Sequence, residues 1–129
     1  MKKILVMLLL ALISAMASAQ EQKGTKAVQN MEVIVDDHKI ISDKLIDGVR
    51  YISATPSAVV CSKKIDIEIK DGIIMKVAYT RGCDGNAKGI GALIKGMPVD
   101  EAVRRLEGIT CGKRPTSCPD QLARILKSL

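Results

Sequence analysis

The feature that most constrains the fold is a strand-turn-strand pattern between residues 65 and 80. Every second residue from Ile65 to Ile69 is isoleucine and alternates with a charged residue, which is typical of a strand buried on one face. Asp71-Gly72 follows directly, and both residue types tolerate the positive φ of a tight turn. The run 73–80 is rich in β-branched and large residues, and the pattern therefore predicts a β-hairpin. We expect one face of the second strand to carry Met75, Val77 and Tyr79.

Three segments with helical spacing follow this hairpin. Each is bounded by a residue suited to a helix end: Gly96 after the first, Pro98 before the second, Gly108 after the second and Pro119 before the third. Their apolar stripes are Ala87, Ile90, Leu93 and Ile94; Val99, Ala102, Val103 and Leu106; and Leu122, Ile125, Leu126 and Leu129. Strands followed by helices predict an α+β fold, in which three helices pack on one face of a small antiparallel sheet.

Two glycines interrupt the first of these helical segments. A glycine inside a helix costs up to about 1 kcal/mol relative to alanine. We therefore expect Gly89 and Gly91 to be required by a close approach of the sheet or of a ligand.

The N-terminal residues resemble an export signal. A basic start at Lys2-Lys3, an apolar block over residues 4–16 and an Ala-x-Ala pattern ending at Ala19 predict a signal peptide of residues 1–19. The mature chain would begin at Gln20 and be periplasmic or secreted, with no membrane span left after removal of the signal. Two alternatives stay open. The segment could be an uncleaved anchor, or translation could start at Met31 and yield a cytoplasmic protein.

The residues after the predicted signal divide into two parts. Residues 20–30 are polar without an apolar period, which predicts a flexible mature N-terminus. Residues 31–56 form a predicted β segment, with a β-prone run at 31–35 and an Asp47-Gly48 turn between apolar residues. We expect this segment to add strands to the sheet or to cover one of its edges, and the remaining residues 57–129 to form the main domain.

The composition argues against a nucleic-acid partner. The chain contains two Tyr, no Phe and no Trp, so the core must be built from aliphatic side chains. Without aromatic rings to stack on bases, the net charge of +6 is more typical of a solvated basic face than of a nucleic-acid interface. A domain this small gains useful stability from cross-links or a metal, which directs attention to the cysteines.

Four cysteines have the spacing C-x21-C-x27-C-x6-C; Cys61, Cys83 and Cys118 lie at ends of predicted elements and Cys111 lies in a predicted loop. No C-x-x-C pattern occurs, so any joint site must be assembled by the fold. Because hairpin strands are antiparallel, Cys61 before the first strand and Cys83 after the second should meet at one end of the sheet. Cys118 is expected to be the N-cap of the last helix, where backbone N–H groups and the helix dipole favour a thiolate. Asp120 lies in the first turn of the same predicted helix, where the helix dipole favours a carboxylate.

The run Thr116-Ser117-Cys118-Pro119-Asp120 resembles the motif that names the TSCPD family. The likeness extends over residues 57–129 and includes the segments 61–65, 82–86 and 88–97. Members of this family are small stand-alone proteins, and related domains occur near the C-terminus of cobalamin-dependent ribonucleotide reductases. The resemblance implies an accessory role beside a ribonucleoside-diphosphate reductase or a nucleotide. It does not imply catalysis by this chain, which is too short to contain the radical-generating barrel of those enzymes.

The order of cysteines and elements is also similar, more distantly, to the U-type scaffold proteins of iron-sulfur cluster assembly. That similarity implies that Cys61, Cys83 and Cys118 hold a cluster or zinc, with Cys111 as an additional fourth ligand. The chain departs from those scaffolds at Ser62-Lys63, where they have Gly-Asp. The missing carboxylate argues against cluster transfer.

Three interpretations of the cysteines stay open at this stage. The first is one zinc or iron-sulfur site formed by Cys61, Cys83, Cys111 and Cys118, near cations at Lys63, Lys64, Lys113 and Arg114 that would offset thiolate charge. The second is a disulfide-stapled periplasmic interaction module, with Cys111–Cys118 and Cys61–Cys83 as the simplest pairing. The third is four inert thiols. We favour the metal site and a role in binding rather than in turnover, because the single histidine, His38, lies in a polar segment far from the motif.

Overall fold

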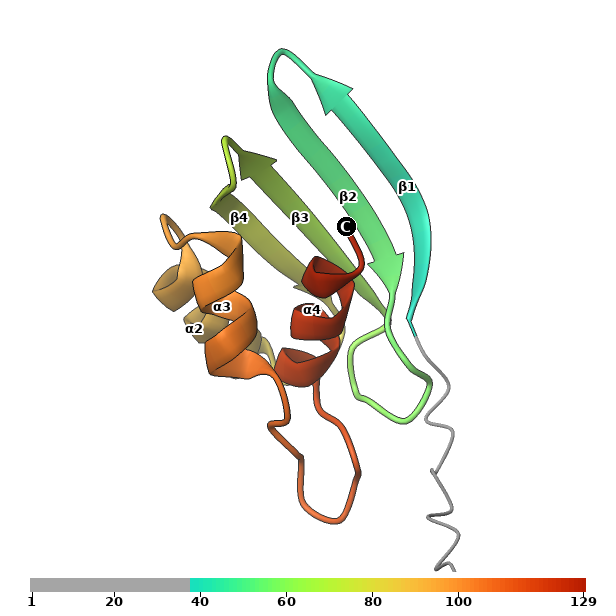
Figure 1. The fold of residues 1–129 in the computed structure, drawn as a ribbon. Coiled ribbons are helices and arrows are strands. Elements are labelled where there is room, and N and C mark those ends of the chain that lie inside the picture. The colour runs from blue at the N-terminus through green and yellow to red at the C-terminus, as the bar shows by residue number, and fades with distance from the viewer. Residues whose placement is uncertain (1–37) are drawn as a thin grey trace, which may run out of the picture. The chain divides into compact units, whose positions relative to one another are not determined.

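The structure is a computed structural model, and it describes residues 38–129 (Figure 1). The predicted signal peptide (1–19), the predicted flexible segment (20–30) and the β-prone run at 31–35 lie outside the described residues. Within residues 38–129, none of the helices has the length and apolar character needed to cross a membrane.

Four antiparallel strands form one sheet in the order β1-β2-β3-β4. They are β1 (Lys39–Ile46), β2 (Val49–Thr55), β3 (Lys64–Lys70) and β4 (Ile73–Thr80). Both predicted Asp-Gly turns are confirmed, since Asp47 and Gly48 have φ of 50° and 77°, and Asp71 and Gly72 have φ of 51° and 73°. Positive φ at both central residues is the geometry that matches the twist of hairpin strands.

Three helices follow the sheet: α2 (Asp84–Ile94), α3 (Val99–Leu106) and α4 (Cys118–Lys127) (Figure 1). Gly96 and Gly108 follow the first two in the left-handed conformation, with φ of 83° and 80°. The predicted α+β fold is therefore confirmed.

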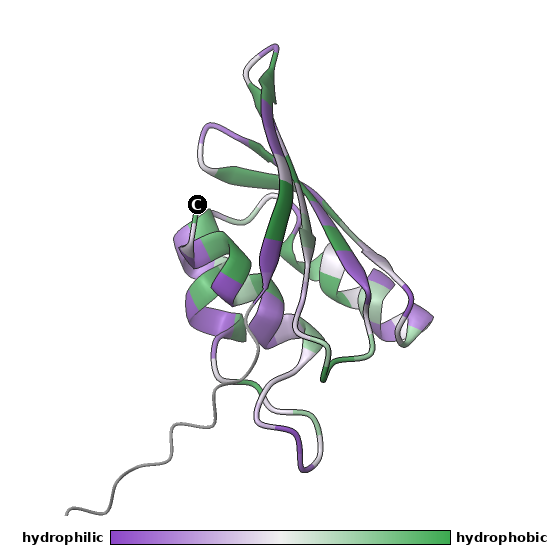
Figure 2. Cartoon of the chain, turned by 90° about the vertical axis from the view of Figure 1, so that its right-hand side faces the viewer, coloured by the Kyte–Doolittle hydropathy of each residue, from purple (hydrophilic) through white to green (hydrophobic). Residues whose placement is uncertain are grey.

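One face of the sheet packs against the helices. The alternating isoleucines Ile65, Ile67 and Ile69 of β3 are buried, as the sequence pattern predicted. The helices cover them with apolar residues that include Ile94, Ala102, Leu106, Leu122, Ile125 and Leu126. The opposite face of the sheet carries charged residues, and Asp66 and Glu68 form ion pairs there with Lys64 and Lys76. The alternation of apolar and polar residues along the strands is visible in Figure 2.

The prediction that Met75 shares one face of β4 with Val77 and Tyr79 is wrong for Met75. Pairing of β3 with β4 shifts register between Glu68 and Ile69, which face Lys76 and Ile74 respectively. Met75 is the extra residue of this β-bulge, so its side chain is 40% exposed while Ile74 is fully buried. In a β-bulge, two residues of one strand lie opposite a single residue of the partner strand. Beyond the bulge, the inward and outward positions along the bulged strand are therefore exchanged.

The two helix glycines have different surroundings. A Cβ atom on Gly91 would lie 2.8 Å from the carbonyl oxygen of Val77, so β4 approaches α2 too closely for a side chain there. Nothing lies within 4 Å of the same position on Gly89. The expected close approach of the sheet is therefore confirmed for Gly91 and wrong for Gly89.

Candidate functional site

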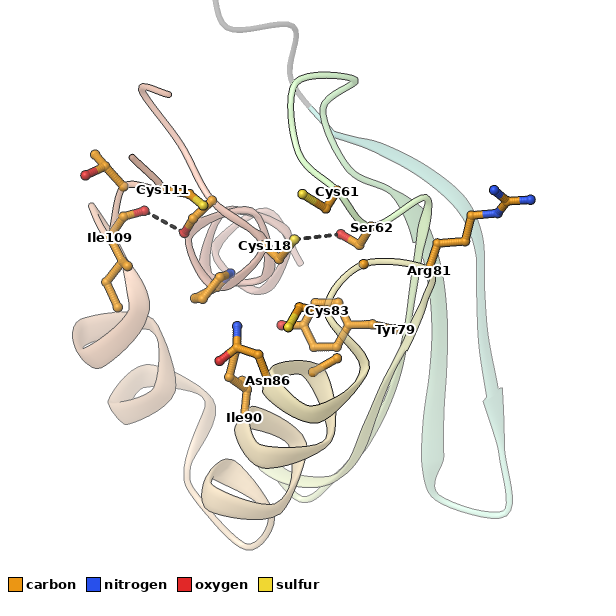
Figure 3. Close-up of a pocket in the computed structure, with 15 residues that line it drawn as sticks. Cys61, Ser62, Tyr79, Arg81, Cys83, Asn86, Ile90, Ile109, Cys111 and Cys118 are labelled. Carbon is orange, nitrogen blue, oxygen red and sulfur yellow. Dashed lines mark hydrogen bonds between the residues drawn. The ribbon is translucent and has the colours of Figure 1, made fainter. Parts of the chain in front are cut away.

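A pocket of about 270 Å³ opens at the end of the sheet where β3 begins and β4 ends. All four cysteines line it, although they come from four separate segments of the chain (Figure 3). Its other walls are largely apolar and include Tyr79, Ala87, Ile90, Ile109 and Pro119. The structure thus brings the four predicted site residues to one cavity.

The β3–β4 hairpin places two of the cysteines. Cys61 precedes β3, and Cys83 is the N-cap of α2 just after β4. The backbone N–H of Lys63 donates to the carbonyl of Thr80 at 2.9 Å and extends the pairing towards the pocket. Gly82 has a φ of 100° and lies against the Ser62 backbone. A Cβ atom added to Gly82 would lie 3.5 Å from the Ser62 nitrogen. The expectation that Cys61 and Cys83 meet at one end of the sheet is therefore confirmed.

Cys118 occupies the first turn of α4, but it is not the N-cap as predicted. Ser117 is the N-cap, and its hydroxyl accepts from the backbone N–H of Asp120 at 3.2 Å. The same hydroxyl donates to the carbonyl of Ile109 at 2.6 Å. A serine hydroxyl caps a helix well, because it accepts an N–H that has no partner inside the helix. Because Ser117 is the N-cap, the Cys118 sulfur does not cap the helix, and Cys118 lines the pocket.

Two side chains that are not cysteines contact the sulfur atoms. The Ser62 hydroxyl donates to Cys118 Sγ at 3.2 Å, and Arg114 Nη1 donates to Cys61 Sγ at 3.0 Å. Ser62 is only 1% exposed, so its hydroxyl is held in place by the surrounding protein. The hydrogen bond to Cys61 raises the pKa of the Arg114 guanidinium, with further increases from the charges of Cys61, Cys111 and Cys118. Of the four cations that the sequence places near the thiols, Arg114 is thus the one with a hydrogen bond to a sulfur.

Tyr79 contributes a buried hydroxyl to the pocket. Its oxygen has no hydrogen-bond partner among the described residues. Burial raises the pKa of Tyr79 above its usual range, and the charge of Cys118 raises it further, so the phenol keeps its proton. The sequence pattern did not indicate Tyr79 as a site residue. It indicated only that Tyr79 lies on one face of a strand.

The thiols share the pocket without forming a closed metal centre. Within residues 38–129, no three Cys, His, Asp or Glu side chains stand close enough together to hold a metal ion. All four cysteines are free thiols, so neither Cys61–Cys83 nor Cys111–Cys118 is joined by a disulfide. Cys61, Cys83 and Cys111 are exposed to solvent and Cys118 is partly buried. The thiols are therefore accessible both to a metal and to oxidants.

The motif residues around Cys118 build the support for the pocket. Asp120 is 1% exposed and accepts from the Gly108 N–H at 2.7 Å, the Thr116 hydroxyl at 2.5 Å and Arg124 Nε at 2.9 Å. Gln121 is fully buried and joins α4 to the segment before β3, since its side-chain oxygen accepts from the Ser57 N–H at 2.9 Å. Asp120 therefore does more than interact with the helix dipole.

The histidine lies elsewhere. His38 Nε2 is 2.9 Å from Ser128 Oγ, and His38 lines a different cavity together with Asp120 and Arg124. Among the described residues, the lining of the cysteine pocket does not include His38.

Comparison with protein families identifies the domain. A family model described as the TSCPD domain matches residues 46–129. The chain belongs to the TSCPD family. The match includes β2 as well as the residues from Ser57 onward, so the TSCPD domain contains three complete strands and the three helices of the described residues. No curated protein and no solved structure matches the chain. The more distant likeness to iron-sulfur scaffold proteins stays a prediction.

Proposed function

We propose that this TSCPD protein binds a thiophilic metal, as a zinc ion or an iron-sulfur cluster, through Cys61, Cys83, Cys111 and Cys118. The observation that carries the proposal is that four thiols from four segments line one pocket. Thiolates are the preferred protein ligands of zinc and of iron-sulfur clusters. Binding rather than turnover is the activity that we propose.

Charge in and around the pocket supports the same proposal. A metal held by four thiolates carries a net negative charge, which is costly beside an apolar wall. Arg114 supplies a cation at Cys61, and the Ser62 hydroxyl supplies a hydrogen bond at Cys118. Groups that contact metal-bound sulfur in this way stabilise the charged form of the ligand.

Metal binding requires the thiols to move closer together. In a zinc site every sulfur lies about 2.3 Å from the metal. Cys111 lies between α3 and α4, in a turn closed by pairing of Cys111 with Arg114 and by Gly112 at φ of 59°. We expect this turn to move inward on binding, because Cys61, Cys83 and Cys118 each adjoin a strand or helix.

The experiment that tests the proposal is anaerobic titration of the reduced protein with Co²⁺, followed by Zn²⁺. We expect thiolate-to-cobalt absorption that saturates at one ion per chain and disappears when Zn²⁺ displaces Co²⁺. Cys118→Ser should lower Co²⁺ affinity by at least about 100-fold, because the site loses a thiolate. Thr55→Ser, at an exposed position outside the pocket, is the control and should bind as the unsubstituted protein does.

A parallel arm tests the iron-sulfur form by anaerobic reconstitution with Fe²⁺ and sulfide. The proposal is contradicted if neither thiolate-to-cobalt absorption nor a cluster chromophore develops. An increase in Tm with a ribonucleoside diphosphate, in protein that binds neither metal, would instead favour the accessory role in ribonucleotide reduction.

A further inference from the structure

Two hydrogen bonds join the segment before β3 to the start of α4, and both end on a sulfur. Arg114 Nη1 donates to Cys61 Sγ at 3.0 Å. The next residue after Cys61 is Ser62, and its hydroxyl donates to Cys118 Sγ at 3.2 Å. Arg114 itself lies shortly before Cys118 in the chain. The two stretches of chain therefore lie against each other, and Cys61 is next in sequence to the residue that contacts the Cys118 sulfur.

A third contact fixes the same packing away from the sulfurs. Gln121 is fully buried, and its side-chain oxygen accepts from the Ser57 N–H at 2.9 Å. In Figure 3 the Cys118 sulfur points from α4 towards the segment that carries Cys61 and Ser62, and the Cys61 sulfur points back towards α4. A disulfide forms only between side chains that point towards each other across a short backbone separation. Cys61 and Cys118 have this orientation.

The two sulfurs differ in their access to solvent. Cys61 is exposed, whereas Cys118 is partly buried and is held by the hydroxyl of Ser62, which is itself only 1% exposed. Because the rate of thiol–disulfide exchange depends on access, a dissolved disulfide reacts with Cys61 before Cys118. Cys83 and Cys111 are exposed as well, so exposure does not by itself select a pair. The contacts between the two segments select Cys118 as the partner of Cys61.

We propose that Cys61 and Cys118 are a redox-active pair of thiols that exchanges with low-molecular-weight disulfides. Cys61 Sγ attacks one sulfur of the small disulfide, whose S–S bond breaks and releases one small thiol. Cys118 Sγ then attacks Cys61 Sγ in this mixed disulfide, and the second small thiol leaves. The two cysteines are oxidised, the small disulfide is reduced to two thiols, and the two protons lost by the cysteines end on those thiols. This inference goes beyond the proposed function and requires no metal.

Chain length alone favours a different pair. Only six residues separate Cys111 from Cys118, whereas a bond between Cys61 and Cys118 closes a far longer loop. Closing a longer loop costs more conformational entropy in a flexible chain. A Cys61–Cys118 bond that forms in the folded protein and is replaced by Cys111–Cys118 in the unfolded chain would therefore report the packing of the two segments.

The experiment exposes the reduced protein, kept metal-free with a chelator, to oxidised glutathione. Free thiols are then alkylated, and tryptic peptides are analysed by mass spectrometry. Trypsin places the four cysteines on four separate peptides, which cover residues 51–63, 82–88, 106–113 and 114–124. We expect peptides 51–63 and 114–124 to be joined as the predominant linkage in folded protein. In urea the predominant linkage should change to 106–113 with 114–124.

Two variants test the order of the two steps. Cys118→Ser should accumulate glutathione on Cys61, because the second attack is lost while the first remains. Cys83→Ser, at an exposed cysteine of the same pocket, is the matched control and should form the Cys61–Cys118 bond as the unsubstituted protein does. Circular dichroism verifies that both variants are folded.

Three results would contradict this inference: a predominant Cys61–Cys83 bond in folded protein, a predominant Cys111–Cys118 bond there, or no bond between cysteines. The mapping of the unsubstituted protein decides among them even if a variant fails to fold. Because no metal is present, failure of the Co²⁺ titration leaves this inference standing. Absence of the Cys61–Cys118 bond likewise leaves the proposed metal site standing.

Discussion

The five residues of the motif from Thr116 to Asp120 have two different kinds of role. Ser117 caps α4, Pro119 suits its first turn, and Thr116 donates to the buried carboxylate of Asp120. These residues form the start of a helix. Cys118 alone among them presents a reactive atom that receives a hydrogen bond from a distant residue, Ser62. The motif therefore combines a rigid helix start with one sulfur placed in the pocket.

Asp120 should be the most important polar residue for stability. Asp120→Ala removes the acceptor of the Gly108 N–H and of the buried Thr116 O–H, and it also removes the partner of Arg124. We expect a loss of about 2–4 kcal/mol in the free energy of unfolding, measured by urea denaturation of the metal-free protein. Asp84→Ala is the control, because Asp84 also lies in a first helical turn but its side chain is 80% exposed. A similar urea midpoint for the two variants would show that Asp120 does not have this role.

Some site residues could be predicted from the sequence and others could not. Cys61, Cys83 and Cys118 could be found because each lies near the end of an element whose pattern is local, and Cys111 because it lies close to the motif in the chain. Ser62 could not, because its contact is with Cys118, which is 56 residues away in the chain. The same holds for Arg114 and Cys61, which are 53 residues apart. A contact of that range depends on how loops are placed, and no local pattern records it.

At the scale of elements, the pocket depends on how closely α2 packs against β4. The Val77 carbonyl oxygen lies only 2.8 Å from where a Cβ on Gly91 would be, so the helix packs directly against the strand. This packing supports the start of α2, where Cys83 and Ala87 line the cavity. A shift of the helix away from the sheet would therefore widen the pocket.

Gly91→Ala should be destabilising, whereas Gly89→Ala should be stabilising. The first places a methyl group 2.8 Å from a backbone oxygen, and we expect a loss of about 1–3 kcal/mol because backbone must shift. The second meets open space inside a helix, and we expect a gain of up to about 1 kcal/mol. Thermal unfolding followed by circular dichroism measures both changes. Equal effects of the two substitutions would contradict the close packing of α2 on β4.

At the scale of the whole molecule, the described residues form one domain with its chemistry at one end. The segment before β3 and the segment between α3 and α4 meet there through the contact of Arg114 with Cys61. The rest of the domain holds these two segments in place through a core of aliphatic side chains. Exposed thiols in such an arrangement are sensitive to the compartment, because an oxidising one favours disulfides and a reducing one favours thiolates.

The export signal and the state of the thiols can be tested together. We expect native mass spectrometry of the protein, purified from its own host without reductant, to give a chain that begins at Gln20 and carries metal. A chain that begins at Gln20, lacks metal and has lost hydrogens in pairs would identify a disulfide-stapled module instead. A chain that begins at Met1 would contradict cleavage after Ala19 and leave the uncleaved anchor or the cytoplasm, whereas one that begins at Met31 would place the protein in the cytoplasm.

The sequence by itself determined the α+β fold, both Asp-Gly hairpins and the three helices, because alternation, helical spacing and turn residues are local properties of the chain. Only the tertiary structure decided that Met75 points outward, since a bulge depends on the pairing of two strands. It also decided that Ser117 caps α4 and that Ser62, Tyr79 and Arg114 join the cysteines. These features depend on distances between segments far apart in sequence, which are set by how the helices pack on the sheet.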